Sequence, residues 1–180
     1  MSSAAPSLPE KSELERLVRI RAIPAEPVRI DASETERAAL SKRFGLSVVE
    51  SLRAEARLHP KGQSVRATGE LEAKIVQRCA ISNEDFPVQI TEEFDFRFVP
   101  QQEREYDPEE EIELDAQDCD EIEYEGEAFD LGEAVAQTLG LAIDPFATGP
   151  DAEAARKEAG IVDEVATGPF AALAALKTGG

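Results

Sequence analysis

The chain has little of what most enzymes use for catalysis. Its 180 residues include one histidine, two cysteines and no tryptophan, and its eleven glycines are scattered rather than grouped into a phosphate-binding loop. His59 lies beside Pro60 at the polar end of a strand-like run, so a Ser–His–Asp or Cys–His arrangement would depend on a residue expected at the surface. We therefore predict a protein that is not an enzyme, with no cofactor and no bound metal.

Cysteine spacing and hydropathy exclude two further classes. Cys79 and Cys119 lie 40 residues apart, which fits neither a disulfide framework nor a paired metal site, so we expect two free thiols. No apolar run approaches the roughly 20 residues that a membrane span needs. The first residues, MSSAAPSLPEKSELERL, lack the apolar stretch of a secretory signal. These absences predict a cytoplasmic protein without a membrane partner.

Negative charge is concentrated in one part of the chain. Residues 103–127, the acidic segment, contain fourteen Asp and Glu against Arg104 alone, which gives −13 of the total net charge of −19. Such a block repels itself and resists burial, so it stays solvated or meets a basic partner. Four interpretations remain open: a solvated loop that keeps the protein soluble, a contact for a basic protein, a nucleic-acid mimic, or a weak cation site.

Hydrophobic periodicity predicts a sheet in the middle of the chain. From Leu46 to Phe98, apolar and polar residues alternate with a period of two over three runs joined by short turns, the first at Pro60–Gly62. A shorter alternation at Leu17–Ile23 predicts another strand, and Ile122 and Tyr124 alternate near the end of the acidic segment. Long strands with one polar face predict an antiparallel meander whose apolar side needs a cover.

Two helices are expected to supply that cover. Ser33, with Glu36 three residues later, forms a capping box that begins the first helix, and Gly45 ends it. Asp130 begins a second helix with an apolar stripe at helical spacing. The predicted class is α+β, with a bent antiparallel sheet, open or curved into a partial barrel, covered by helices and carrying an acidic loop and flexible termini.

The expected organisation is one domain between two tails. The domain covers residues 14–147 and includes the acidic segment, whereas residues 1–13, rich in Ser, Ala and Pro, predict a disordered N-terminus. Residues 148–180 predict a linker and a short helix within GPFAALAALK. On that helix Phe170, Leu173 and Leu176 are candidates for docking on a partner or on the sheet. The alternative is a frayed end, as short isolated helices usually are.

Arginines form a second candidate surface. Six of them occupy the first strand and the polar face of the sheet and could contact RNA phosphates. Glutamates are interleaved with them and aromatic residues are missing from that face, so an ordinary mixed surface is the other interpretation. The six residues are Arg19, Arg21, Arg53, Arg57, Arg66 and Arg78.

Four motifs in a fixed order resemble a known family. VQRCAIS, which contains the pair Arg78 and Cys79, is followed by VQITEEFDFRF, by the acidic connection and by DLGEAVAQTLGLAIDP. From about Ser47 to Lys177 the chain is similar to the bacterial YceD family, associated with accumulation of large-subunit ribosomal RNA. The GPFAALAALK ending resembles that of many alphaproteobacterial members. Many members carry Cys-x-x-Cys where this chain has Val76 to Cys79, so a zinc or redox role does not transfer to a lone thiol.

The resemblance implies a role in making or stabilising the large ribosomal subunit. Combined with the charge pattern, it predicts a noncatalytic ribosome-biogenesis factor that binds a basic ribosomal protein or a pre-ribosomal large subunit. The partner-binding candidates are Asp107, Glu109, Glu110, Glu111, Glu113, Asp115, Asp118, Asp120, Glu121 and Glu123. Direct binding of ribosomal RNA by the arginine face is the second hypothesis. A metal-dependent nuclease that uses Asp115, Asp118 and Asp120 is the third.

Overall fold

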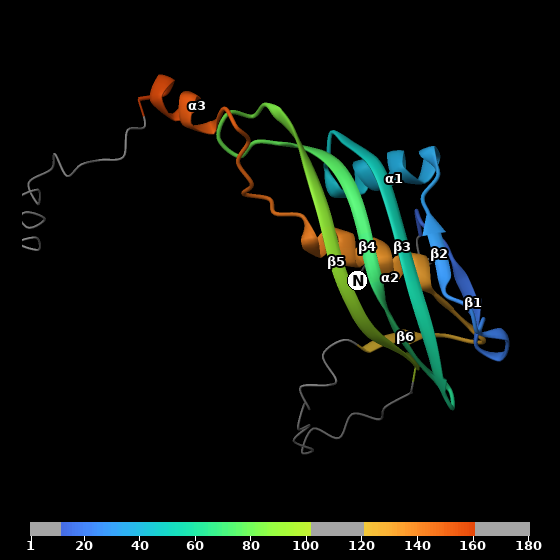
Figure 1. Ribbon diagram of the computed structural model, residues 1–180. Helices are drawn as coiled ribbons and strands as arrows, with labels where there is room; N and C mark the ends of the chain where they lie inside the picture. The colour runs from blue at the N-terminus through green and yellow to red at the C-terminus, as the bar shows by residue number, and fades with distance from the viewer. Residues whose placement is uncertain (1–11, 102–120, 161–180) are drawn as a thin grey trace, which may run out of the picture. The chain divides into compact units, whose positions relative to one another are not determined.

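The computed structural model describes residues 12–101 and 121–160, which belong to two compact units (Figure 1). The first unit contains the chain up to Gln77 together with Pro87–Asp144, and the second contains Arg78–Phe86 and the chain from Pro145 onward. The candidate tail residues Phe170, Leu173 and Leu176 lie outside the described residues. In the described part, no helix is long and apolar enough to cross a membrane.

A five-stranded sheet is the centre of the first unit. Its strands follow the order β2-β3-β4-β5-β6, and β2, β3 and β4 pair antiparallel. β5 follows β4 after a connection too short for a parallel crossover. β6, in contrast, pairs parallel with the last residues of β5. The bounds are Val28–Asp31 for β2, Val48–Lys61 for β3, Ser64–Arg78 for β4, Asp85–Pro100 for β5 and Glu121–Tyr124 for β6.

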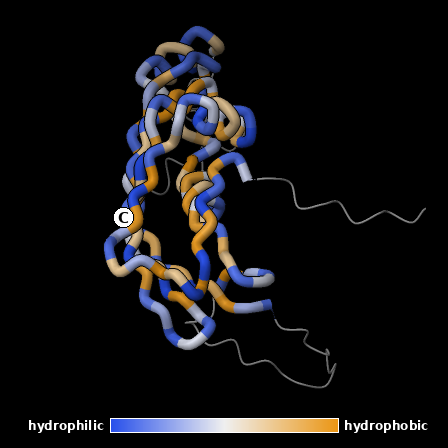
Figure 2. Tube along the Cα trace, turned by 90° about the vertical axis from the view of Figure 1, so that its right-hand side faces the viewer, coloured by the Kyte–Doolittle hydropathy of each residue, from blue (hydrophilic) through white to orange (hydrophobic). Residues whose placement is uncertain are grey.

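The predicted division of the sheet into a polar and an apolar face is confirmed. Leu52 and Leu58 on β3 and Leu71 and Ile75 on β4 are buried, whereas the residues between them are mostly exposed. Figure 2 shows the resulting alternation of hydrophilic and hydrophobic residues along the strands. Period-two alternation places successive side chains on opposite faces, so the pattern itself determines which face is covered.

The first hairpin turns two residues later than expected. β3 continues through Pro60 to Lys61, which pairs with Ser64, and only Gly62 and Gln63 form the turn. Gly62 has φ of 66°, a left-handed conformation that glycine adopts without steric cost. Pro60 lies near the end of β3. Its backbone nitrogen faces the edge of β3 that β2 covers over only four residues, and β2 does not extend as far as Pro60. The missing N–H of proline therefore costs no hydrogen bond of the ladder.

A second, two-stranded sheet joins β1, near the start of the described chain, to β7, the strand directly before helix α2, Leu131–Ala142. β1, Leu17–Arg19, pairs antiparallel with β7, Ala128–Asp130. The predicted strand at Leu17–Ile23 is therefore wrong beyond Arg19, because β7 offers only three partner residues. The chain instead continues as a short 3-10 helix, Ile20–Ala22, held by a hydrogen bond from the Ile20 N–H to the Glu127 carbonyl.

Helix α1, Glu34–Phe44, begins and ends as predicted. The Ser33 hydroxyl accepts from the Glu36 amide while the Glu36 carboxylate accepts from the Ser33 amide, which completes the capping box. Gly45 adopts φ of 66° at the C-terminal cap. Leu40 is fully buried in the core beneath the helix.

Helix α2, Leu131–Ala142, supplies the larger part of the cover. Asp130 caps it as predicted by accepting from the Gly132 and Glu133 amides, and Leu131, Val135 and Leu139 are fully buried. These side chains and Leu40 belong to one core cluster with the apolar face of the sheet, so both helices cover the same face. Figure 1 shows α2 crossing behind the strands.

The second unit is smaller. The connection after β4 closes through hydrogen bonds from the Cys79 amide to the Glu84 carbonyl and from the Ala80 amide to the Ala147 carbonyl. The run expected to be a linker contains a seven-residue helix, α3, Ala152–Glu158. The α+β class and the helical cover are thus confirmed. The described strands form an open sheet without barrel closure, and β6 makes it mixed rather than purely antiparallel.

Candidate functional site

The acidic segment is anchored in the fold at its C-terminal end. Glu121–Tyr124 form β6, in register with Arg97–Pro100, and the Gln101 amide donates to the Tyr124 carbonyl at 2.9 Å. The Tyr124 hydroxyl donates to the Gln63 carbonyl at 2.6 Å, and its ring is buried. Glu121 and Glu123 face solvent on the same strand.

The interpretation of residues 103–127 as one solvated loop is therefore wrong for Glu121–Tyr124. Ile122 and Tyr124 pack against the core, and Phe129, which follows, stacks on Phe98 with 4.0 Å between the ring centroids. Burial of these side chains outweighs the repulsion among neighbouring carboxylates, which remain in water.

Eight of the ten proposed partner-binding acids fall outside the described residues. These are Asp107, Glu109, Glu110, Glu111, Glu113, Asp115, Asp118 and Asp120. Glu121 and Glu123 lie on β6, and Glu125 and Glu127 follow as further exposed carboxylates. Within residues 12–101 and 121–160, no group of three or more His, Cys, Asp or Glu side chains could hold a metal ion.

The candidate arginines lie in different parts of the fold. Arg53, Arg57 and Arg66 project from the solvent face of the five-stranded sheet. Arg19 lies on β1 of the small sheet, and Arg21 lies in the 3-10 helix and contacts Glu127 at 3.3 Å. Arg78 belongs to the second unit.

Cross-strand pairing neutralises much of the solvent face. Arg53 contacts Asp31 at 3.4 Å and lies opposite Glu72, and Arg66 forms a two-pronged contact with Asp95. The face is therefore mixed in charge, which agrees with the ordinary-surface interpretation. Arg57 is an exception, since it forms no ion pair with a described residue and lies opposite Thr68.

A shallow hollow of about 450 Å³ lies on this face. It is lined by Glu50, Ser51, Arg53, Glu72, Ala73, Lys74 and Gln89. Glu50 enters it because the register with β4 shifts between Val49 and Ser51, which makes Glu50 an unpaired extra residue. Two carboxylates and two cations in the lining give no preference for a ligand of either sign.

Cys79 is a buried thiol, as predicted from its position after β4. A hydrogen bond with the Ser82 side chain, together with the Ser82 and Ile81 amides at 3.4 Å from Sγ, lowers the pKa of the Cys79 thiol to about 7. Backbone and hydroxyl donors stabilise a thiolate more than a thiol. Cys119 lies outside the described residues.

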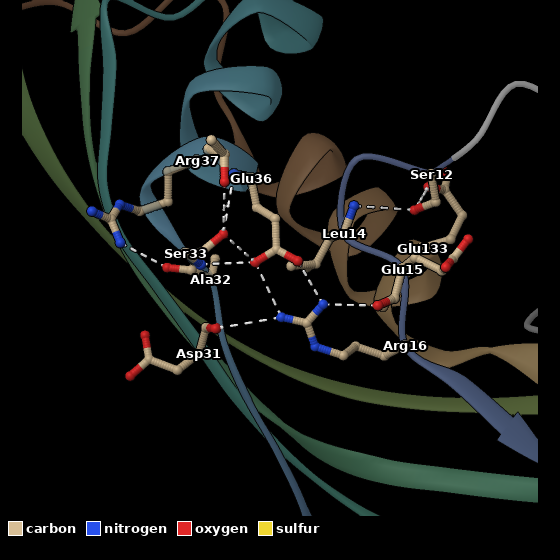
Figure 3. Close-up of polar contacts among 12 residues, drawn as sticks. Ser12, Leu14, Glu15, Arg16, Asp31, Ala32, Ser33, Glu36, Arg37 and Glu133 are labelled. Atoms are coloured by element: carbon tan, nitrogen blue, oxygen red, sulfur yellow. Dashed lines mark hydrogen bonds and ion pairs between the residues drawn. The ribbon is translucent and has the colours of Figure 1, made fainter.

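Sequence reasoning missed a polar network that joins the N-terminal residues to both helices. The Arg16 guanidinium donates to both carboxylate oxygens of Glu36, at 2.6 and 3.1 Å, and to the backbone carbonyls of Glu15 and Asp31 (Figure 3). The Arg16 hydrogen bond lowers the pKa of Glu36 to about 2. The capping box signalled only the local partner of Glu36, since nothing in the sequence points from Glu36 to Arg16.

A second cluster completes this network. Arg43 of α1 donates to Glu133 of α2 at 2.7 Å and to Glu13 at 2.8 Å, and Ser12 donates to Glu133 at 2.8 Å. The Arg43 hydrogen bond lowers the pKa of Glu133 to about 2. These pairs hold the two helices and residues 12–16 together.

Comparison with known proteins assigns the fold to a family. No curated protein and no solved structure is significantly similar to the chain. A family model described as "Large ribosomal RNA subunit accumulation protein YceD" matches residues 67–177, from β4 through the acidic segment and both later helices. This span is more than half of the 180 residues. The chain therefore belongs to the YceD family and has that family's role in the accumulation of large-subunit ribosomal RNA.

Proposed function

We propose that this chain is a noncatalytic ribosome-biogenesis factor whose acidic segment binds a basic ribosomal protein, free or within a pre-ribosomal large subunit. By holding such a protein, it supports synthesis, processing or accumulation of large-subunit rRNA. The family supplies the ribosomal role. The distribution of charge supports the mode of binding.

The observation that carries the proposal is a contrast between two surfaces. On the solvent face of the sheet, arginines contact carboxylates, as in the pairs Arg53–Asp31 and Arg66–Asp95. Around β6, four exposed carboxylates end a segment of net charge −13. Among the described residues, only two of these four contact an arginine: Glu121 contacts Arg97, and Glu127 contacts Arg21. At the described end of the acidic segment, Glu123 and Glu125 therefore carry negative charge that no described arginine balances.

Such an arrangement attracts a basic protein over a long range. Charges in solvent interact across about 8 Å at physiological ionic strength, and complementary potentials raise association rates more than they tighten the final contact. Binding should therefore weaken steeply as salt is added. A partner held mainly by an apolar contact would respond to salt much less.

Matched variants of the full chain test the proposal. One variant neutralises Glu121, Glu123, Glu125 and Glu127 to Gln, and a longer variant also neutralises the eight acids between Asp107 and Asp120. The control removes four exposed charges from the solvent face, at Glu50, Glu55, Glu70 and Glu72. The assay is capture of basic large-subunit ribosomal proteins from a lysate, at low and high salt, with and without ribonuclease.

We expect the first variant to weaken capture, the longer variant to abolish it and the control to leave it unchanged. Capture that persists in the longer variant would contradict the proposal. Direct RNA binding would be supported instead if capture were lost on treatment with ribonuclease and also in the variant with Arg53, Arg57, Arg66 and Arg78 changed to Glu. The position of Arg57, opposite Thr68 and without an ion pair to a described residue, favours this second function. Metal-dependent RNA cleavage that disappears with Asp115, Asp118 and Asp120 changed to Asn would support the nuclease hypothesis.

A further inference from the structure

Among the strands that the structure describes, none pairs with most of the outer edge of β5. β5 extends over 16 residues, but β6 pairs only with Arg97–Pro100, and no other described strand lies beyond it in the sheet order. Within this edge, the free stretch Gln89–Asp95 belongs to the first unit. Figure 1 shows β5 at the border of the sheet. An unpaired edge of this length is a template on which an extended chain can form a further ladder.

The hydrogen bond at the end of β5 identifies the residues that face this edge. The Gln101 amide donates toward β6, and the direction of backbone N–H groups alternates along a strand. Ile90, Phe94, Phe96 and Phe98 are all even-numbered and buried, so the phase of the strand is the same on both sides of Glu92, which is exposed. The N–H and C=O groups of the odd-numbered residues therefore point outward. These residues are Gln89, Thr91, Glu93 and Asp95, and they span about 20 Å of strand.

Charge determines which chain this edge accepts. Glu92 and Glu93 are exposed and form no ion pair with a described residue, and Glu121 and Glu123 lie further along the same border on β6. Two copies of β5 placed edge to edge would bring carboxylates against carboxylates, which disfavours self-pairing. An extended segment with Lys and Arg side chains meets attraction at the same positions.

We propose that the edge Gln89–Asp95 binds an extended, Lys- and Arg-rich segment of the partner protein by strand addition. The inference rests on the proposed function, because it assigns the basic partner a docking position next to β6, the described end of the acidic segment. Backbone hydrogen bonds supply affinity, and the carboxylates of Glu92 and Glu93 supply preference for a basic sequence. The acidic segment and this edge then make separable contributions to one complex.

The test uses the full chain and a defined probe, a fluorescent decapeptide of alternating Lys and Val. Thr91→Pro removes an outward N–H and adds bulk at the edge, whereas Thr91→Val keeps the N–H and the branched shape. We expect Thr91→Pro to weaken peptide binding about tenfold, by loss of a ladder hydrogen bond and steric exclusion, and Thr91→Val to change it less than about twofold. A peptide of alternating Glu and Val should not bind.

Charge is tested at the same edge. Glu92→Gln combined with Glu93→Gln should weaken binding about fivefold at low salt, and the matched pair Glu70→Gln with Glu72→Gln should have little effect. Hydrogen exchange of the wild-type chain should show added protection at the amides of Gln89, Thr91, Glu93 and Asp95 when the peptide is bound. This measurement decides the question even if Thr91→Pro fails to fold.

Equal binding by Thr91→Pro and Thr91→Val, or protection confined to other strands, would overturn strand addition. If capture of basic ribosomal proteins still depended on Glu121–Glu127 in that case, the proposed function would stand without this docking mode. If the edge were protected but the acid variants captured normally, the electrostatic function would fail instead. A wild-type dimer abolished by Thr91→Pro would identify a second copy as the occupant and would also overturn the inference.

Discussion

Replacing Gly132 with alanine tests how closely α2 packs against residues 12–16. A Cβ at Gly132 would lie 1.6 Å from the Leu14 carbonyl oxygen, 2.8 Å from its carbonyl carbon and 3.0 Å from the Arg16 nitrogen. All three are backbone atoms, so rotation of a side chain cannot relieve the overlap. The N-terminal residues must move away from the helix by more than about 1.5 Å to reach an ordinary C···O contact.

The expected loss in the free energy of unfolding follows from the contacts of residues 12–16 that this movement breaks. Leu14 is fully buried, and its exposure costs about 2 kcal/mol. Hydrogen bonds from the Arg16 amide to Asp130, from the Leu131 amide to the Arg16 carbonyl and from Ser12 to Glu133 contribute about 1 kcal/mol each. Alanine regains up to about 1 kcal/mol in a helix relative to glycine. With partial relaxation, we expect a net destabilisation of about 3 kcal/mol, opposite in sign to helix propensity alone.

Urea unfolding of the Gly132→Ala chain measures this destabilisation. Faster hydrogen exchange at the amides of residues 14–16 would show that these residues have moved. Gly140→Ala in the same helix is the control, since the three atoms nearest to its Cβ would be side-chain ring atoms of Phe44, the closest at 2.7 Å, and that ring can turn. The control should change the free energy of unfolding by less than about 1 kcal/mol, because the gain in propensity offsets the ring movement. A stabilised Gly132→Ala chain would refute the close packing.

Two further predictions concern titration. Glu36 and Glu133 have folded pKa values near 2, below the ordinary 4.5, chiefly because Arg16 and Arg43 donate hydrogen bonds to them. The two carboxylates therefore stabilise the folded chain fully above about pH 4.5, and this contribution is lost as the pH falls toward 2. Urea titrations between pH 5 and 2.5 should show this decline, and Glu36→Gln with Glu133→Gln should flatten it; parallel curves would contradict the assignment. The rate at which Cys79 reacts with iodoacetamide in a Cys119→Ser chain should rise with a midpoint near pH 7 rather than 9.0. Ser82→Ala should move that midpoint upward, and an unchanged midpoint would rule out the hydroxyl as its cause.

Sequence patterns predicted those features that depend on neighbours along the chain. The starts of both long helices were predicted from their N-caps, Ser33 with Glu36 for α1 and Asp130 for α2. This worked because a capping side chain and the amides that it satisfies lie within one turn of each other. The alternation on β3 and β4 gave the buried face, because side chains on a strand repeat every two residues. Both rules use only local periodicity, which is why they succeeded.

Features that depend on distant partners could not be predicted. The parallel pairing of β6 with β5 and the antiparallel pairing of β1 with β7 join residues whose sequence contains no signal for the other strand. Leu17–Ile23 alternates along its whole length, yet only three residues find a partner. The acids near β6 were recognised by charge, whereas the open edge of β5 became visible only once the sheet order was known.

The pairing of β1 with β7 has a consequence for synthesis of the chain. Val18 lies opposite Phe129, so β1 leaves the ribosome long before its partner strand, which is made more than 100 residues later. Contacts of such long sequence separation form late in folding, after local hairpins such as β3 and β4. Residues 12–19 should therefore be the last part of the unit to become ordered, and any nascent chain that stalls before α2 is released would leave Leu14 and Val18 uncovered.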